Sequence, residues 1–341
     1  MTIMKTHSFW LRLSVATLAS SSVISLAIYN LGNIPLTSQA IERQKLILND
    51  NQSRIAKWWQ SEVENIGQDL SNPELHSRSL NILQAKRHSK SDITSENSQV
   101  LESILSSHSK NRNSASLLTK GGIVVFSTNH KRYAAYQPLK NTTTTLELFE
   151  LPRKPLNFFT DSITGLPSIS VALPIHSEAK ARAGFLAIDL NLQMLNKQVL
   201  DNSTALQGSA DSPGSYKSYL VARTSLDQAT FIAPPDSSQS DYKFKPLDSA
   251  GITKALDGIS GQGLYLNSDG IPVIGVYQFL PNFRTALLVE SPQSEVYASS
   301  RHKALKIFEA GVILSLGFLL AGLTIGRRKD KLNISAPLHG S

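Results

Sequence analysis

Two apolar segments, one near each end of the chain, constrain the fold more than any other feature of the sequence. They run from Leu13 to Leu31 and from Ile307 to Ile325. Each is close to the roughly 20 residues that a helix needs to cross a bilayer core. Lys5 and Arg12 precede the first segment, and a basic cluster from Arg327 to Lys331 follows the second. By the positive-inside rule, we expect both ends in the cytoplasm and the middle of the chain to be exported.

The first apolar segment has two interpretations. It contains several Ser and Thr residues, and the small-x-small pattern Ser38-Gln39-Ala40 after it is typical of a signal-peptide cleavage site. We favour an uncleaved anchor over a cleaved signal. We expect a cytoplasmic start (1–12), a membrane helix (13–33) and an exported domain (34–303). A second membrane helix (304–326) and a cytoplasmic tail (327–341) follow.

Composition indicates that the exported part is folded. Apolar residues make up 41% and charged residues 18% of the chain, a balance unlike that of disordered chains. There is no cysteine, which excludes a disulfide framework and a thiolate metal site. The net charge of +8 is spread along the chain apart from the basic cluster near its end, so we expect no binding to nucleic acid.

Motifs of catalysis are absent from the sequence. It contains no Gly-x-Ser-x-Gly, no His-Glu-x-x-His, no phosphate-binding loop and no cysteine nucleophile. The eight histidines stand mostly in polar surroundings, and no calcium-loop spacing occurs. We therefore expect no enzymatic activity, no cofactor and no metal site.

A long helix is predicted directly after the first apolar segment. Ile41, Leu48 and Ile55 are spaced by seven residues, and apolar residues at intervals of three and four continue the stripe to Leu70. Asn72-Pro73 ends the pattern. A helix of about 30 residues would be about 45 Å long. We expect one end to pack on the domain and the other to enter the membrane, although a surface helix with one buried stripe explains the same period.

The rest of the middle region alternates strands with short helices in two successive sets. A glycine turn between apolar runs predicts a hairpin over Ser116–Thr128. A polar stretch at 203–215 separates the two sets. The further strands are expected at Ser168–Ile175, Ala183–Leu190, Tyr219–Thr224, Thr230–Ala233, Gly261–Leu266, Ile271–Phe279 and Thr285–Glu290. Short helices are expected at Val100–Leu105, Leu192–Leu200, Gly251–Leu256 and Pro292–Lys303.

These segments resemble the double Cache family of sensor domains. The distal half of such a domain is similar to Leu117–Asn129, Phe159–Ile175 and Gly184–Leu190. The proximal half is similar to Ala255–Gly263, Gly270–Tyr277 and Leu280–Glu290. The resemblance covers about residues 35–300, with halves at about 75–202 and 210–300. It implies a mixed α+β fold in which a long N-terminal helix spans two PAS-like antiparallel sheets, flanked by two transmembrane helices.

The resemblance also implies a ligand site in the distal half. Asp189 matches an aspartate that meets the ligand in amino-acid sensors of the family. The Arg-x-Trp-Tyr pattern of those sensors has no match, because Arg153–Phe159 occupies the corresponding region, so a bidentate carboxylate clamp is missing. Asp189 could instead cap the following helix. We expect the pocket to be bounded by Asp189 and by four aromatic residues: Tyr133, Tyr136, Phe158 and Phe159. Asp161 is either a ligand contact or a turn residue.

The resemblance and the two apolar segments together suggest a membrane-anchored sensor that binds a small molecule. We expect it in the inner (plasma) membrane, with its main domain on the periplasmic side. Only about 15 residues follow the second apolar segment, so we expect no output domain. A signal would then need the lipid-embedded helices and either a homodimer or a separate signalling partner. The alternative is a structural or envelope-assembly protein that keeps the scaffold without a ligand.

Overall fold

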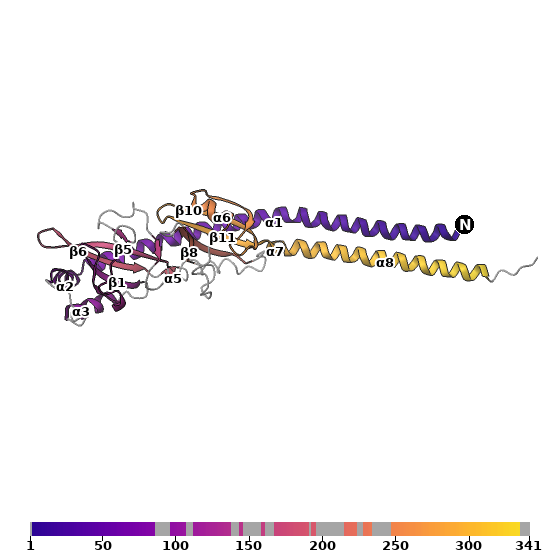
Figure 1. The fold of residues 1–341 in the computed structure, drawn as a ribbon. Coiled ribbons are helices and arrows are strands. Elements are labelled where there is room, and N and C mark those ends of the chain that lie inside the picture. Colours follow the sequence, from indigo (N-terminus) through magenta and orange to yellow (C-terminus); the bar gives the residue numbers. More distant parts are fainter. Residues whose placement is uncertain are drawn as a thin grey trace, which may run out of the picture. The chain divides into compact units, whose positions relative to one another are not determined.

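The computed structural model (Figure 1) divides into two compact units, residues 1–40 with 293–341 and residues 41–292. Each unit is described by itself. The residues whose structure is described are 2–85, 96–106, 112–137, 143–145, 158–160, 167–190, 192–195, 215–223, 228–233 and 247–334.

The first unit is a pair of helices joined by hydroxyl groups. It contains the start of α1 (Thr2–Leu70), the short α7 (Gln293–Val296) and α8 (Ala298–Ile334). The Oγ atoms of Ser14 and Ser315 lie 2.6 Å apart, and the Ser25 hydroxyl donates to the carbonyl of Ala304 at 2.7 Å. These contacts hold α1 beside α8, as Figure 1 shows.

The helices of the first unit have the character of membrane spans. Two helical stretches are long and apolar enough to cross a bilayer, Ser8–Asp69 and Ala298–Ile325, with mean hydropathies of 1.6 and 2.0 in their most apolar windows. Large apolar side chains on both helices are exposed, among them Leu31 at 69% and Ile313 at 70%. Exposed apolar surface of this extent is expected where lipid replaces water. The two apolar segments predicted from the sequence are therefore helices suited to a membrane.

The second unit is built on two sheets. The first sheet contains β1 (Arg112–Thr119), β2 (Val124–Ser127), β3 (Thr143–Thr145), β4 (Phe158–Thr160), β5 (Pro167–His176) and β6 (Arg182–Leu190). The second sheet contains β7 (Lys217–Arg223), β8 (Ala229–Ala233), β9 (Gly261–Leu266), β10 (Pro272–Leu280) and β11 (Thr285–Pro292). The helices of this unit besides α1 are α2 (Pro73–Gln84), α3 (Glu96–Ser106), η3 (His130–Arg132), α5 (Leu192–Leu195) and α6 (Ala250–Leu256).

The two sheets repeat one topology. The first has the order β2-β1-β6-β5-β3, with β4 also paired to β5, and the second has the order β8-β7-β11-β10-β9. In each sheet, the strand that comes first in the sequence pairs with the one that comes last, β1 with β6 and β7 with β11. The second strand, β2 or β8, therefore lies at one edge. Among the strands that the structure describes, all pairings are antiparallel except that of β3 with β5, which is parallel. The two antiparallel sheets expected from the sequence are confirmed, with this one short parallel pairing at an edge of the first sheet.

The second half of α1 is the helix on which both sheets pack. Ile47, Ile55, Trp59 and Ile66 are at most 5% exposed and belong to one apolar cluster with residues of both sheets. The spacing of three and four between apolar positions brings these side chains to one face of the helix. The predicted buried stripe is confirmed. So is the mixed α+β fold with a long N-terminal helix spanning two sheets.

Most predicted elements appear within one to four residues of their expected bounds. The helix α2 was missed, as were the short η3, β3 and β4. The case of α2 is instructive. Its signal was present, because Asn72 accepts hydrogen bonds from the backbone N–H groups of Glu74 and Leu75 and Pro73 occupies the first helical position. Asn72-Pro73 therefore ends one helix and begins the next. The predicted boundary at 203–215 falls almost wholly outside the described residues.

Candidate functional site

The first sheet has one apolar face, against α1, and an opposite face that combines polar side chains with a small apolar cluster of Leu118, Val124, Ala172, Phe185 and Ala187. The polar part of that opposite face is called the polar face below. On β6, Leu186, Ile188 and Leu190 belong to the apolar cluster of α1, and strand alternation directs Asp189 to the opposite side. The same alternation places serines from three other strands on that side, each at most 4% exposed: Ser114, Ser116, Ser127, Ser168 and Ser170. Buried hydroxyls in this number give the face many hydrogen-bonding groups in a water-poor setting.

Asp189 lies at the centre of this polar face. Its Oδ2 accepts a hydrogen bond from the hydroxyl of Ser114 at 2.6 Å and lies 2.7 Å from Nη1 of Arg132. The side chains of Asp189 and Arg132 are 3% and 8% exposed. A buried carboxylate is tolerated when a cation and hydrogen bonds compensate its lost hydration. These contacts compensate the buried charge of Asp189, and both roles predicted for this residue, ligand contact and helix cap, stay predictions.

A return of the chain after β2 carries Arg132 to the sheet. Backbone hydrogen bonds join Ala134 to Val124 and Gln137 to Gly122, so 134–137 runs beside the start of β2. Gln137 then donates from Nε2 to the hydroxyl of Ser170 at 2.9 Å. Arg132 and Gln137 thus close over the polar face from the same short segment, and both are buried.

The other residues predicted for this site are less well defined. Tyr133 is half-buried and Tyr136 is 66% exposed. Phe158 and Phe159 pair through β4 with Ile169 and Ser168 of β5, next to the polar face, but their side chains are outside the described part. Asp161 also lies outside the described residues. The roles assigned to these five residues stay predictions.

The sequence did not reveal Arg132 or the serines as site residues. Arg132 follows Asn129-His-Lys in a polar turn, which is an ordinary surface pattern. The serines carried a usable signal, because Ser114 and Ser116, like Ser168 and Ser170, alternate along strands. A period of two in small polar residues predicts one polar face.

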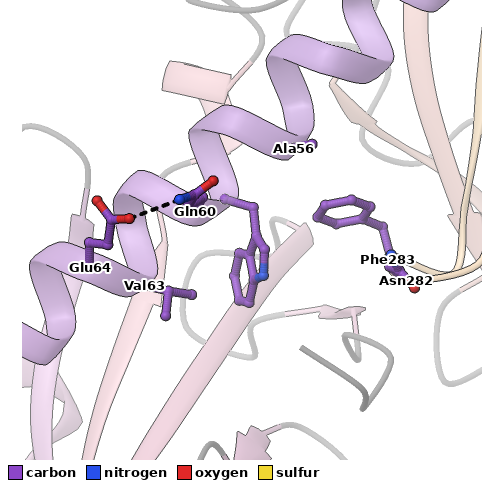
Figure 2. Close-up of a pocket in the computed structure, with 7 residues that line it drawn as sticks. Ala56, Gln60, Val63, Glu64, Asn282 and Phe283 are labelled. Atoms are coloured by element: carbon purple, nitrogen blue, oxygen red, sulfur yellow. Dashed lines mark hydrogen bonds between the residues drawn. The ribbon is translucent and has the colours of Figure 1, made fainter. Parts of the chain in front are cut away.

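A separate groove lies along α1 (Figure 2). Ala56, Trp59, Gln60, Val63 and Glu64 of the helix form one wall, and Asn282 and Phe283 of the β10–β11 turn form the other. Its volume is about 280 Å³.

The interior of this groove is apolar. The Trp59 and Phe283 rings pack edge to face, with centroids 6.2 Å apart. Gln60 donates to Glu64 at 3.0 Å on the rim, where Figure 2 draws the bond. Because its polar groups lie on the rim, the groove offers a polar ligand fewer hydrogen-bonding partners than the face around Asp189 does.

Metal ligands do not gather anywhere in the residues that the structure describes. No group of three or more His, Cys, Asp or Glu side chains that could hold an ion occurs among them.

Comparison with solved structures places the fold among sensor domains. The chain is similar to the sensor domain of the V. cholerae histidine kinase DctB, with 14% identity, a TM-score of 0.51 and coverage of 75% of this chain and 98% of that one. It is also similar to the sensory domain of the Campylobacter jejuni chemoreceptor Tlp3 with isoleucine bound, with 14% identity, a TM-score of 0.42 and coverage of 77% and 96%. No family model and no curated protein sequence matches the chain. The double Cache-like fold recognised in the sequence is confirmed as a fold.

Proposed function

We propose that this protein is a membrane-anchored extracytoplasmic sensor that binds a small molecule on the polar face of its first sheet. The observation that carries the proposal is the buried group of Asp189, Arg132, Gln137 and the facing serines. Buried positions on the opposite face of this sheet are filled by leucine and isoleucine. Packing alone therefore does not require polar side chains at the buried positions around Asp189. The likeness of the fold to a kinase sensor domain supports the same role.

The chemistry of the face favours a small ligand with polar groups. Arg132 can donate to an anionic oxygen, Asp189 can accept from a cationic or neutral N–H group, and the serine hydroxyls can do either. A ligand that inserted between Arg132 and Asp189 would replace their 2.7 Å ion pair with contacts of its own. The chain lacks the Arg-x-Trp-Tyr pattern of amino-acid sensors, and Arg132 supplies a guanidinium at this face from a different place in the sequence.

The signal would leave the domain through the helices of the membrane. α1 is continuous from Thr2 to Leu70 and so joins the membrane segment to the sheets in one element. The chain would act on a homodimer partner or on a separate membrane or signalling protein, in the inner membrane with the sheets on the periplasmic side. No catalytic step is part of the proposal.

A second function is favoured by the same ion pair. Because Asp189 and Arg132 already compensate each other's charge, the polar face could serve only to fix the fold. The protein would then be a structural or envelope-assembly component that keeps the scaffold without a ligand.

A thermal-shift screen of small metabolites separates these functions. We would compare the wild type with Asp189→Asn, and use Asp257→Asn as the matched control because Asp257 pairs with Arg223 at the surface. A hit on the polar face should bind about ten- to a hundredfold more weakly to Asp189→Asn, the range for a hydrogen bond to a charge, and unchanged to the control.

Two other outcomes are informative. A compound that shifts all three proteins equally removes Asp189 from the ligand site. A broad screen without any hit, combined with lower stability of Asp189→Asn, supports the structural alternative.

A further inference from the structure

A second buried polar cluster lies in the other sheet, away from the face around Asp189. Glu290 on β11 is 4% exposed and Tyr219 on β7 is 3% exposed. Tyr265 on β9 is half-buried, and its hydroxyl is fully shielded from solvent. Strand alternation places all three on the face that α6 covers, and Figure 1 shows α6 beside β10 and β11. Three polar side chains therefore meet inside an apolar layer.

The three side chains are close together and yet incompletely bonded. Burial raises the pKa of the Glu290 carboxyl, and the nearby hydroxyls of Tyr219 and Tyr265 offset part of that rise. Neither hydroxyl, however, makes a hydrogen bond of acceptable geometry within the described residues, and neither does Oε1 of Glu290. Leaving a buried polar atom without a partner costs about 1–3 kcal/mol. Three such atoms at one place point to a missing group.

Glycines make room for this arrangement. The Tyr265 ring lies over Gly275 and Gly251, since a Cβ at Gly275 would lie 2.1 Å from its hydroxyl and one at Gly251 would lie 2.5 Å from its ring. Gly275 is the register neighbour of both Glu290 and Gly263. A Cβ at Gly263 would meet no atom of the described chain within 4 Å. The sheet thus has open space one strand beyond Gly275, on the side where the tyrosine hydroxyl and the carboxyl lie.

The surroundings favour a cation over an anion. Asp269, in the turn between β9 and β10, adds a second negative charge that acts on Glu290. Lys217 is the register neighbour of Glu290 on β7, but it is exposed and forms no ion pair with Glu290 in the described structure. The cluster offers a carboxylate oxygen and two phenol oxygens, all of which can accept hydrogen bonds.

We propose that this cluster is a second ligand site, which binds a primary ammonium group. The –NH₃⁺ group has three donors, and Glu290 Oε1, Tyr219 Oη and Tyr265 Oη provide three acceptors. Its charge compensates Glu290, as a buried carboxylate requires. Ammonium itself and small amines carry the same group. The site lies in the second sheet and is independent of a ligand at Asp189.

Equilibrium dialysis of the full chain in lipid nanodiscs against radiolabelled methylammonium tests the proposal. Glu290→Gln should weaken binding about ten- to a hundredfold, because it removes a hydrogen bond to a charge. Tyr219→Phe and Tyr265→Phe should each weaken it about tenfold or more, because each removes an acceptor of a hydrogen bond from the charged ammonium group. Tyr277→Phe is the matched control, since Tyr277 is a buried neighbour of Tyr265, with ring centroids 6.1 Å apart, and does not act on Glu290. Asp189→Asn should bind as the wild type does.

Competition defines the chemical class. Ammonium chloride and butylammonium chloride should displace the label, and comparing them shows whether the site admits an alkyl chain. Tetramethylammonium has no N–H donor and should not displace it. The proposal is overturned if the wild type does not bind methylammonium or if potassium chloride competes as well as ammonium. It is also overturned if Tyr277→Phe loses as much affinity as Tyr219→Phe. Thermal unfolding without amines checks that each variant is folded, and the two isosteric tyrosine variants carry the test if Glu290→Gln is not.

Discussion

Arg112 at the start of β1 contacts Asp69 near the end of α1 through Nη1 and Oδ2, at 2.5 Å, with side chains 2% and 5% exposed. This buried pair joins the long helix to the first strand of the first sheet. Removing one partner of a buried pair leaves the other charge uncompensated. Asp69→Asn should therefore lower the free energy of unfolding by about 3–5 kcal/mol. Urea unfolding followed by the fluorescence of Trp58 and Trp59 measures the loss.

Two comparisons sharpen that experiment. Arg54→Ala removes a partly exposed ion pair with Asp50 on the same helix and should cost about 0.3–0.5 kcal/mol. Replacing both members of the buried pair by Leu and Met should recover much of the lost stability, because no charge then stays buried. An equal loss from Asp69→Asn and Arg54→Ala would contradict the assignment of the pair as structural.

The hydroxyl contact between Ser14 and Ser315 predicts a disulfide. The chain has no cysteine, so Ser14→Cys with Ser315→Cys introduces one unique pair. With the hydroxyls 2.6 Å apart, oxidation should form an intrachain bond that changes mobility in a denaturing gel. Ser14→Cys with Ile313→Cys is the control, since Ile313 is 70% exposed on α8. Crosslinking between two chains in place of one would show that this contact belongs to an oligomer.

The glycines of α8 differ in what surrounds them. A Cβ at Gly322 would lie 2.8 Å from Cβ of Trp10, whereas one at Gly317 would meet nothing within 4 Å of the described chain. Gly322→Val should therefore lower the yield of the Ser14–Ser315 disulfide, and Gly317→Val should leave it unchanged. A similar yield from both variants would mean that the helices do not pack through Gly322.

Glu290 should make folding stability depend on pH. Burial raises its pKa above the ordinary value of 4.5, so the folded chain keeps this proton at pH values where the unfolded chain has lost it. The stability that Glu290 contributes is then full below 4.5 and is lost as pH rises through the raised pKa. Glu290→Gln lacks this loss. Urea unfolding of both proteins from about pH 4 to about pH 8 should show the variant gaining relative to the wild type as pH rises. A constant difference would contradict the prediction.

The membrane topology is tested by reporter fusions. Fusions at residue 1 and after residue 341 should report the cytoplasm, because Arg12 and the cluster from Arg327 to Lys331 resist translocation. A fusion at 236–240 should report the periplasm. A cytoplasmic signal from that position would contradict the proposed exported sensor.

The elements that could be predicted from the sequence are those whose own residues carry a clear pattern of apolar positions. The apolar run of β6 and the stripe from Ile41 to Leu70 are local signals, because each can be read within a few consecutive turns or residues of one element. The fold followed from their order. Arg132 and Glu290 could not be predicted in the same way. Arg132 is buried by pairing with Asp189, which is distant in sequence. Glu290 lies inside β11, two residues before the strand ends, and is buried on the face that α6 covers. Their environments arise from packing between elements, which no local period encodes.

The contact of Tyr265 with Gly251 and Gly275 restricts how this sheet can change in sequence. A side chain at either glycine would occupy the volume that the ring fills, 2.1 Å from the hydroxyl in the case of Gly275. Substitution at 251 or 275 therefore requires a smaller residue at 265, and the phenol oxygen beside Glu290 is lost with it. In related chains, these three positions should covary as one group. A related chain that keeps both glycines and the tyrosine but replaces Glu290 would retain the packing of the ring on the glycines and lack the carboxylate that accepts the ammonium group.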